Sequence, residues 1–169
     1  GVVPNEMPSG WRAKALRAQA VAARSYALAT AGKGEGFDHY DDTRSQVYGG
    51  RSSETRATNA AVEATSRQVV RHNDSVAATY FFSTSGGRTE NSEDGFTGGD
   101  SRPYLRSVKD PYDDASPYHR WTVTYTLAEA EDRLGGLVEG RLKGIEVTKR
   151  GRSPRIVRGS RRRRSGPSP

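Results

Sequence analysis

The chain has 169 residues, no cysteine, and a formal net charge of +7 from 27 basic and 20 acidic side chains. Its length predicts one domain that can bury a core without a metal or a disulfide. The lack of cysteine excludes disulfides, a thiol nucleophile and thiolate metal ligands. No apolar run approaches the roughly 20 residues that a membrane-spanning helix needs, so we expect no membrane span.

The positive charge is concentrated at the C-terminus. Residues 149–169 contain nine Lys or Arg and no acid, so residues 1–148 carry a net charge of −2. From residue 158 onward Arg, Ser, Gly and Pro predominate, a composition that does not build a core. The arginine block 161–164 also lacks interleaved aromatic residues for base stacking. We therefore expect a domain over residues 1–157, a disordered basic tail over 158–169, and no nucleic-acid binding by the domain.

Two helices dominate the first half of the chain. A long alanine-rich helix is predicted over residues 9–31, with Ser9 as its N-cap and Gly32 after its end. Its predicted packing face, at three- and four-residue steps, comprises Trp11, Ala15, Ala18, Ala22, Tyr26 and Ala29. A shorter helix is predicted over residues 53–66, and its inward side chains are Ala57, Ala60, Ala61 and Ala64.

Short strands and loops make up the remainder. The predicted strands cover residues 68–71, 75–82, 105–108, 120–126 and 141–148. The first two flank Asn73-Asp74 and indicate a hairpin, and a short helix is expected over 127–134. Residues 83–103 lack periodicity, which is typical of a functional loop or a disordered segment. Together the elements predict an α+β domain with a mainly antiparallel sheet.

Glu6 is a candidate general acid. It lies among valines, a methionine and two prolines, just before the long helix. Partial desolvation there would favour the protonated carboxyl that a general acid needs. The alternative is an acid that interacts with the dipole at a helix N-terminus. From the residues alone, this second interpretation is favoured.

The segment 82–91, Phe-Ser-Thr-Ser-Gly-Gly-Arg-Thr-Glu-Asn, is a candidate ligand-binding loop. Its small hydroxyl residues and paired glycines allow backbone donors to approach a ligand closely. Glu90, Asn91 and Glu93 add polar groups suited to sugars or peptides. An ordinary flexible hairpin loop explains the segment equally well.

Two further kinds of site are disfavoured. A serine triad from Ser83 or Ser85, His72 or His119, and an aspartate lacks the nucleophile-elbow motif. The acidic loop around His39 fits no metal-ligand spacing, so a solvated loop is favoured and no metal is expected.

A run of segments carries a family resemblance. It begins with Val2-Val3-Pro4-Asn5-Glu6-Met7-Pro8 and the helical segment 15–26. It continues through residues 46–50, 60–65, 83–94, 103–108, 110–111 and 116–121, and so spans residues 1–148. In this order the segments closely resemble the stage II sporulation protein D family, which carries the SpoIID/LytB domain.

The resemblance implies an extracytoplasmic bacterial enzyme that acts on peptidoglycan glycan strands without a cofactor. Characterised members are lytic transglycosylases, lyases that cleave between N-acetylmuramic acid and N-acetylglucosamine. Glu6 matches their essential glutamate, which would protonate the glycosidic oxygen and then accept the proton of the sugar's own C6 hydroxyl. A 1,6-anhydro ring forms, so the second carboxylate of an ordinary glycosidase is not needed.

The resemblance also implies substrate contacts and two departures. The matching positions are Gln19, Arg24 and Tyr26 on the helix, Tyr48 at the rim, and Ser83, Ser85, Gly86, Gly87 and Thr89 in the loop; all of them fit a framework role equally well. Some members bind zinc where this chain has Tyr40, Arg44 and Ser45, so we expect no zinc. The family continues into further strands after about Ile156, so a truncated domain is expected.

Two other functions stay open. The first is a non-catalytic module that binds the wall or modulates amidases, a role associated with the LytB side of the family, with other cell-wall hydrolases as partners. The second is nucleic-acid binding through the basic tail, which would weaken steeply with salt.

Overall fold

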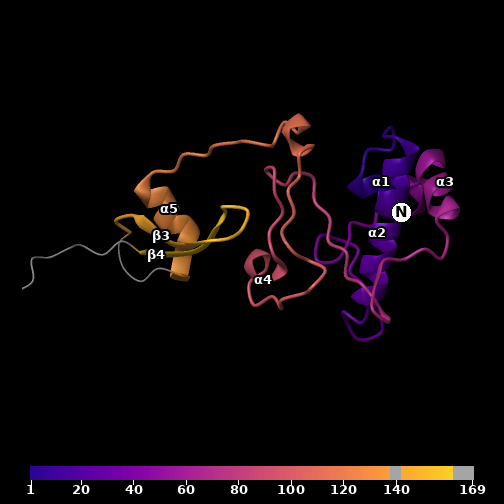
Figure 1. Ribbon diagram of the computed structural model, residues 1–169, viewed down its shortest axis with the longest axis horizontal. Coiled ribbons are helices and arrows are strands. Elements are labelled where there is room, and N and C mark those ends of the chain that lie inside the picture. Colours follow the sequence, from indigo (N-terminus) through magenta and orange to yellow (C-terminus); the bar gives the residue numbers. More distant parts are fainter. Residues whose placement is uncertain (138–141, 162–169) are drawn as a thin grey trace, which may run out of the picture. The chain divides into compact units, whose positions relative to one another are not determined.

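The computed structural model describes residues 1–137 and 142–161 (Figure 1). The chain divides into two compact units, Gly1–Phe81 and Phe82–Pro169. Helices combine with two antiparallel sheets of two strands each in the described residues, which confirms the predicted α+β class. No helix in this part of the chain is long and apolar enough to cross a membrane.

Unit 1 is mainly helical. It contains α1 (Val3–Glu6), α2 (Ala13–Ala29), the 3-10 turn η1 (Arg51–Ser53), α3 (Arg56–Ala64), and the strands β1 (Arg71–His72) and β2 (Ser75–Val76). Helices α2 and α3 lie side by side (Figure 1). Helix α2 begins after Arg12 rather than at Ser9, because the Trp11 N–H donates to the Pro8 carbonyl at 3.0 Å and closes a separate turn.

The packing face of α2 differs from the predicted one. Leu16, Gln19, Ala20 and Ala23 are buried on one face of the helix, with the spacing that such a face requires. Ser25 is also buried, on the opposite side, where its hydroxyl accepts from the Val70 N–H at 2.9 Å. The predicted face began at Trp11, which precedes the helix and is 57% exposed. Starting from that residue shifted most positions by one, which turns a helical face by about 100°.

Helix α3 is held by a capping box at its start. Thr55 accepts from the Thr58 N–H at 3.3 Å, and the Thr58 hydroxyl accepts from the Thr55 N–H at 3.3 Å. Of the predicted inward alanines only Ala61 is buried, and Thr58 and Thr65 complete the buried face. Thr65 reaches that face because its hydroxyl donates to the Ala61 carbonyl at 2.8 Å.

The predicted hairpin at Asn73-Asp74 is present, with strands shorter than expected. Arg71 pairs with Val76, and His72 pairs with Ser75. Asn73 takes a positive φ of 52°, which asparagine tolerates in tight turns. After β2 the chain buries Ala77 and Ala78. These two residues join Val3, Leu16, Ala20, Ala23 and Ala61 in the apolar core of unit 1.

Unit 2 consists of short elements joined by long loops. Its elements are α4 (Ser92–Gly95), η2 (Asp113–Ala115), α5 (Leu127–Leu134), η3 (Gly135–Leu137), β3 (Ile145–Arg150) and β4 (Ile156–Arg161). Helix α5 has the predicted bounds and begins with a capping box between Thr126 and Glu129. Strands β3 and β4 form an antiparallel hairpin.

Three strand predictions in unit 2 need correction. Residues 105–108 form no strand, although the backbone of Thr89 donates to Val108 at 3.0 Å. Residues 120–126 form none either, because no strand in the described ranges pairs with them. Strand β3 begins at Ile145, and the predicted start at 141 lies outside the described residues. Strand β4 continues to Arg161, past the expected boundary at 157, and residues 162–169 also lie outside the described part.

Candidate active site

Glu6 is the last residue of α1, and its side chain is half-buried. Its Oε1 accepts a hydrogen bond of 3.2 Å from the backbone N–H of Val47. Its other oxygen, Oε2, has no hydrogen-bond or ion-pair partner among the residues that the structure describes. One oxygen is therefore oriented by the backbone while the other is available to carry a proton.

The segment 46–50 lies against the N-terminal motif. The Gly49 N–H donates to the Gly1 carbonyl at 3.2 Å, and Asn5 Nδ2 donates to the Ser53 hydroxyl at 3.1 Å. A Cβ at Gly49 would lie 2.6 Å from Asn5 Nδ2, so a side chain there would displace the Asn5 amide from its present position. Two motifs that are separate in the sequence thus meet around Glu6.

Two glutamines of unit 1, Gln46 beside Val47 and Gln19 on α2, are buried. The Gln46 side chain donates to the Ala23 carbonyl of α2 at 3.3 Å. Gln19, on the buried face of α2, is 7% exposed, and its Nε2 has no partner in the described part of the chain. The Tyr48 side chain is 52% exposed. The predicted substrate contacts of Gln19 and Tyr48 stay predictions.

Arg24 connects α2 to the C-terminal end of α3. Its guanidinium donates to three backbone carbonyls, those of Val62, Thr65 and Gln68, at 3.2, 2.8 and 2.9 Å. The last carbonyls of a helix lack partners within the helix and carry partial negative charge, so this arginine acts as a C-terminal cap. Tyr26 packs edge-to-face on Tyr80 at 5.7 Å. Both side chains have structural roles, and their contact with substrate stays a prediction.

The positions that match zinc ligands in some relatives contact one another here. The Arg44 guanidinium lies 3.8 Å from the centroid of the Tyr40 ring, and the Ser45 hydroxyl accepts from the Tyr40 N–H at 3.1 Å. Over the described residues, no group of His, Cys, Asp and Glu side chains is arranged to hold a metal ion.

In unit 2, the serine–glycine loop (residues 83–89) is organised around the buried carboxylate of Asp113. This carboxylate accepts from the Ser85 N–H at 2.6 Å, the Gly87 N–H at 3.2 Å and His119 Nδ1 at 2.6 Å. Gly86 and Gly87 take φ values of 67° and 91°, a left-handed conformation that favours glycine. The paired glycines therefore allow the loop to fold around one acceptor.

Burial raises the pKa of Asp113, but hydrogen bonds from His119 and the loop backbone outweigh it, and the net pKa lies below its ordinary value. The Ser85 hydroxyl donates to Asp110 at 2.9 Å rather than to His119. Asp113 and His119 thus form a pair without a serine nucleophile, which argues against the serine triad. Ser85 is 2% exposed, whereas Ser83 is exposed.

The end of the loop is fixed by a second carboxylate. Thr89 accepts from the Val108 N–H at 2.9 Å through its hydroxyl. Glu90 accepts from the Ser153 hydroxyl at 2.6 Å and from the Arg152 N–H at 2.9 Å. Burial raises the pKa of Glu90, but the hydrogen bonds from Ser153, Asn91 and Arg152 lower it below its ordinary value. A Cβ at Gly151 would lie 2.0 Å from a Glu90 oxygen.

The carboxylates that shape the loop were not identified from the sequence. Asp110 and the segment 116–121 belong to the resembling motifs, but neither indicates which loop it contacts. The partners lie 25 to 28 positions apart for Ser85 and 62 to 63 positions apart for Glu90. The sequence shows only that flexible glycines and distant acids are both present. Many pairings of glycines with acids are compatible with that pattern, so it did not identify the partners.

Comparison with known proteins identifies the family. Residues 1–72 match the SpoIID family, described as Stage II sporulation protein. The chain is 37% identical over 159 residues to stage II sporulation protein D of Bacillus subtilis (strain 168), which covers 83% of this chain and 45% of that protein. It is 32% identical over 167 residues to the protein of that name from Bacillus amyloliquefaciens, with coverages of 89% and 48%.

A third relative has a different name. The chain is 39% identical over 133 residues to the amidase enhancer of Bacillus subtilis (strain 168), covering 79% of this chain and 17% of that protein. The chain spans less than half the length of these three relatives. The α+β class and the partial burial of Glu6, both predicted from the residues independently of the resemblance, are present in the structure. The chain carries a SpoIID-family domain.

Proposed function

We propose that this domain is an extracytoplasmic peptidoglycan lytic transglycosylase in which Glu6 acts first as the acid and then as the base. One observation carries the proposal: the half-buried Glu6 carboxylate has Oε1 fixed by the Val47 N–H and Oε2 without a partner in the described residues. The match to stage II sporulation protein D supports it.

The geometry fits a single-carboxylate mechanism. Because the backbone donor occupies Oε1, the proton is held on Oε2 and passes to the glycosidic oxygen as the bond from that oxygen to C1 breaks. An oxocarbenium-like centre develops at C1. The Glu6 carboxylate then takes the proton of the C6 hydroxyl. At the same time the C6 oxygen bonds to C1 and closes the 1,6-anhydro ring. The proton lost in the first step is regained in the second.

The predicted substrate residues divide by exposure. We assign a direct glycan contact to Tyr48 of unit 1, whose side chain is exposed; Ser83 of unit 2 is also exposed, and its contact with substrate stays a prediction. We assign positioning roles to Arg24 and Ser85, whose polar groups are bonded within the protein. A positioning residue acts by holding the surrounding backbone in its folded conformation, so its substitution would lower both the stability of the protein and its turnover.

The test is Glu6→Gln, assayed on purified glycan strands with mass spectrometry of 1,6-anhydromuramic products. Glutamine retains an oxygen that can accept from the Val47 N–H but cannot transfer the proton, so turnover should fall by about 10²–10⁴-fold without loss of fold. Glu63→Gln, at an exposed acid on α3, is the matched control and should retain wild-type turnover. Equal product from Glu6→Gln and wild type would overturn the proposal.

The name of the third relative favours a second candidate function. The match to an amidase enhancer supports a non-catalytic module that binds the wall and modulates other cell-wall hydrolases. Sedimentation with insoluble peptidoglycan, combined with stimulation of a purified cell-wall amidase, tests it. Stimulation that persists in Glu6→Gln, without any anhydro product from wild type, would favour this module over the enzyme.

A further inference from the structure

The backbone donor to Glu6 belongs to a segment without regular structure. Residues 46–49 form neither helix nor strand, so the position of the Val47 N–H depends on contacts outside the segment. The hydrogen bond from this N–H to Glu6 Oε1 is 3.2 Å long, at the upper end of the usual range for an N–H donor. A small displacement of the segment would break this bond. The contacts that fix residues 46–49 therefore determine whether the Glu6 carboxylate is held in its orientation.

The side chain of Gln46 fixes this segment to α2. It is 7% exposed, and its Nε2 donates to the Ala23 carbonyl at 3.3 Å. Helix α1, which ends at Glu6, packs beside the same helix (Figure 1). Two adjacent residues thus connect the two helices: the Gln46 side chain binds α2, and the Val47 backbone binds the last residue of α1.

Stability does not account for a glutamine at position 46. The other polar atom of its amide, Oε1, is buried without a partner in the described residues. An unpaired buried acceptor costs free energy, and this cost is comparable to the net gain from one neutral hydrogen bond. The Gln46 amide therefore contributes little to folding. Its consequence lies instead in what the bonded atom holds in place, which is the backbone next to Val47.

We propose that Gln46 is a positioning residue for Glu6. Its amide holds the Val47 N–H against Oε1 and so keeps Oε2 as the oxygen that carries and transfers the proton. This role rests on the proposed function, in which Glu6 is first the acid and then the base. Misplacing a reacting group by about 1 Å can slow a reaction by about 10²-fold. A buried side chain that never contacts the glycan can therefore still control the chemical step.

The test is Gln46→Met, which removes the amide but keeps an unbranched side chain of similar length. On purified glycan strands, kcat should fall by about tenfold, because Glu6 is less often held in its productive orientation. KM should change by less than about twofold, because the substitution alters no surface group that meets the glycan. Wild-type kcat in Gln46→Met would overturn the proposal.

The matched control is Thr79→Val, at a half-buried residue of unit 1. The Thr79 hydroxyl donates to the Ala22 carbonyl of α2 at 2.7 Å, so the valine loses the same kind of bond to the neighbouring carbonyl of the same helix. Urea denaturation should show at least as large a loss of stability as in Gln46→Met, because no unpaired buried atom is removed in compensation. The kcat of Thr79→Val should equal that of wild type. Equal falls of kcat in both variants would indicate general destabilisation and would overturn the proposal.

A second measurement does not depend on turnover. Amide hydrogen exchange at Val47, followed by NMR, reports whether its N–H is held on Glu6 Oε1. Protection of this amide should fall in Gln46→Met and persist in Thr79→Val. Unchanged protection in Gln46→Met would contradict the positioning role, whatever the kcat.

The two measurements separate this proposal from the enzymatic one. If wild type formed no anhydro product while Val47 protection still depended on Gln46, the transglycosylase would be wrong and the link from Gln46 to the Glu6 carboxylate would stand. If wild type formed the product and neither kcat nor protection responded to Gln46→Met, the transglycosylase would stand and the positioning role would be wrong.

Discussion

The two units of the chain are stabilised by different forces. Seven of the eight buried apolar side chains in the described residues belong to unit 1, and only Leu142 belongs to unit 2. Unit 2 is instead organised by two carboxylates, Asp113 and Glu90, each with several donors. The stability gained from apolar burial does not depend on protonation, whereas the stability gained from a hydrogen-bonded carboxylate depends on the carboxylate being ionised. The comparison teaches that the unit with Glu6 is held mainly by an apolar core, while the serine–glycine loop depends on ionised acids.

The largest effect on stability is expected from a cavity in unit 1. Leu16 is 2% exposed, so Leu16→Ala should lower the free energy of unfolding by about 2–5 kcal/mol. The measurement is urea denaturation followed by the helical circular dichroism signal. Leu28→Ala on the same helix, where the side chain is 59% exposed, is the control. Similar losses from both would show that unit 1 lacks the apolar core described above.

A smaller effect is expected from the cap on α3. Arg24→Gln removes a charged donor from three carbonyls and should cost about 1–3 kcal/mol. Arg17→Gln, at an exposed position of α2, should cost less than about 0.5 kcal/mol. The same denaturation assay measures both. Reduced turnover by Arg24→Gln at wild-type stability would instead indicate direct contact with substrate.

Acidification should affect unit 2 before unit 1. The folded pKa values of Asp113 and Glu90 lie below their unfolded values of 3.8 and 4.5. Their ionised forms therefore stabilise the fold above those values, and this stability is lost as the pH falls through the lower folded values. Amide hydrogen exchange at decreasing pH should show the protection of Ser85 and Gly87 falling while that of α2 persists.

Asp113→Asn provides the matched variant for this pH experiment. It removes the ionisable group and sets an amide donor against the N–H groups of the loop, so the loop should lose protection already at neutral pH. The remaining protection should depend less on acid than in wild type. If the loop and α2 lost protection together in wild type, the contrast between the units would be wrong.

The smallest stability effect is expected at Gln19. Its buried Nε2 has no partner in the described part of the chain, so Gln19→Met should leave stability within about 1 kcal/mol of wild type, on the stabilising side. Gln46 also has a buried atom, Oε1, without a partner in the described residues, but Gln46→Met loses a bond to Ala23 and should therefore be the less stable of the two variants. A higher KM for Gln19→Met at normal stability would support the predicted substrate contact.

Local patterns in the sequence predicted the elements that depend on local interactions. Helix α5 has the predicted bounds because its capping box and its terminal Gly135 are sequence neighbours. The turn at Asn73 was predicted for the same reason. The predicted packing face of α2 was wrong because the prediction included Trp11 in the helix. The Trp11 N–H instead donates to the Pro8 carbonyl and closes a separate turn that precedes the helix.

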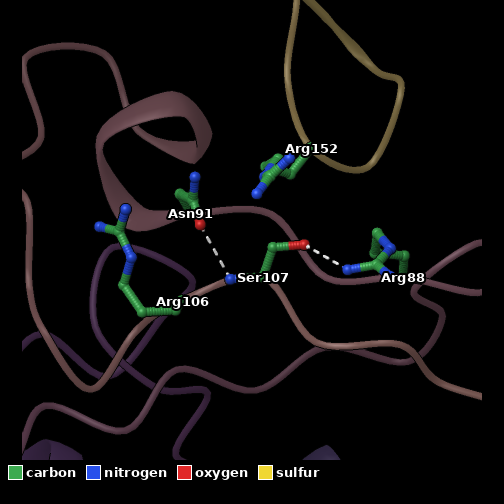
Figure 2. A pocket seen from close by; sticks show the side chains of 5 residues that line it. All are labelled: Arg88, Asn91, Arg106, Ser107 and Arg152. Atoms are coloured by element: carbon green, nitrogen blue, oxygen red, sulfur yellow. Dashed lines mark hydrogen bonds between the residues drawn. The ribbon is translucent and has the colours of Figure 1, made fainter.

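The candidate site could be predicted only in part. The motif at Glu6 identified the candidate acid, but not the Val47 N–H that donates to it, because 41 positions separate the two. The pocket of unit 2 that Arg88, Arg106 and Arg152 line (Figure 2) was not predicted, since these residues meet only when the turn between β3 and β4 bonds to Glu90. Contacts that close long loops depend on the whole fold rather than on any one segment.

The two carboxylates of unit 2 also set an order of events during synthesis. The contacts that hold α2 to α3 and position Glu6 are all made between residues of the range 1–81. Unit 1 can therefore form these contacts once those residues have been synthesised. The serine–glycine loop must wait for Asp113 and His119, and Glu90 must wait for Ser153. Until then, the loop's N–H groups and the Glu90 carboxylate depend on water. The emerging chain can therefore form its scaffold early, whereas the loop can be completed only after these later residues have emerged.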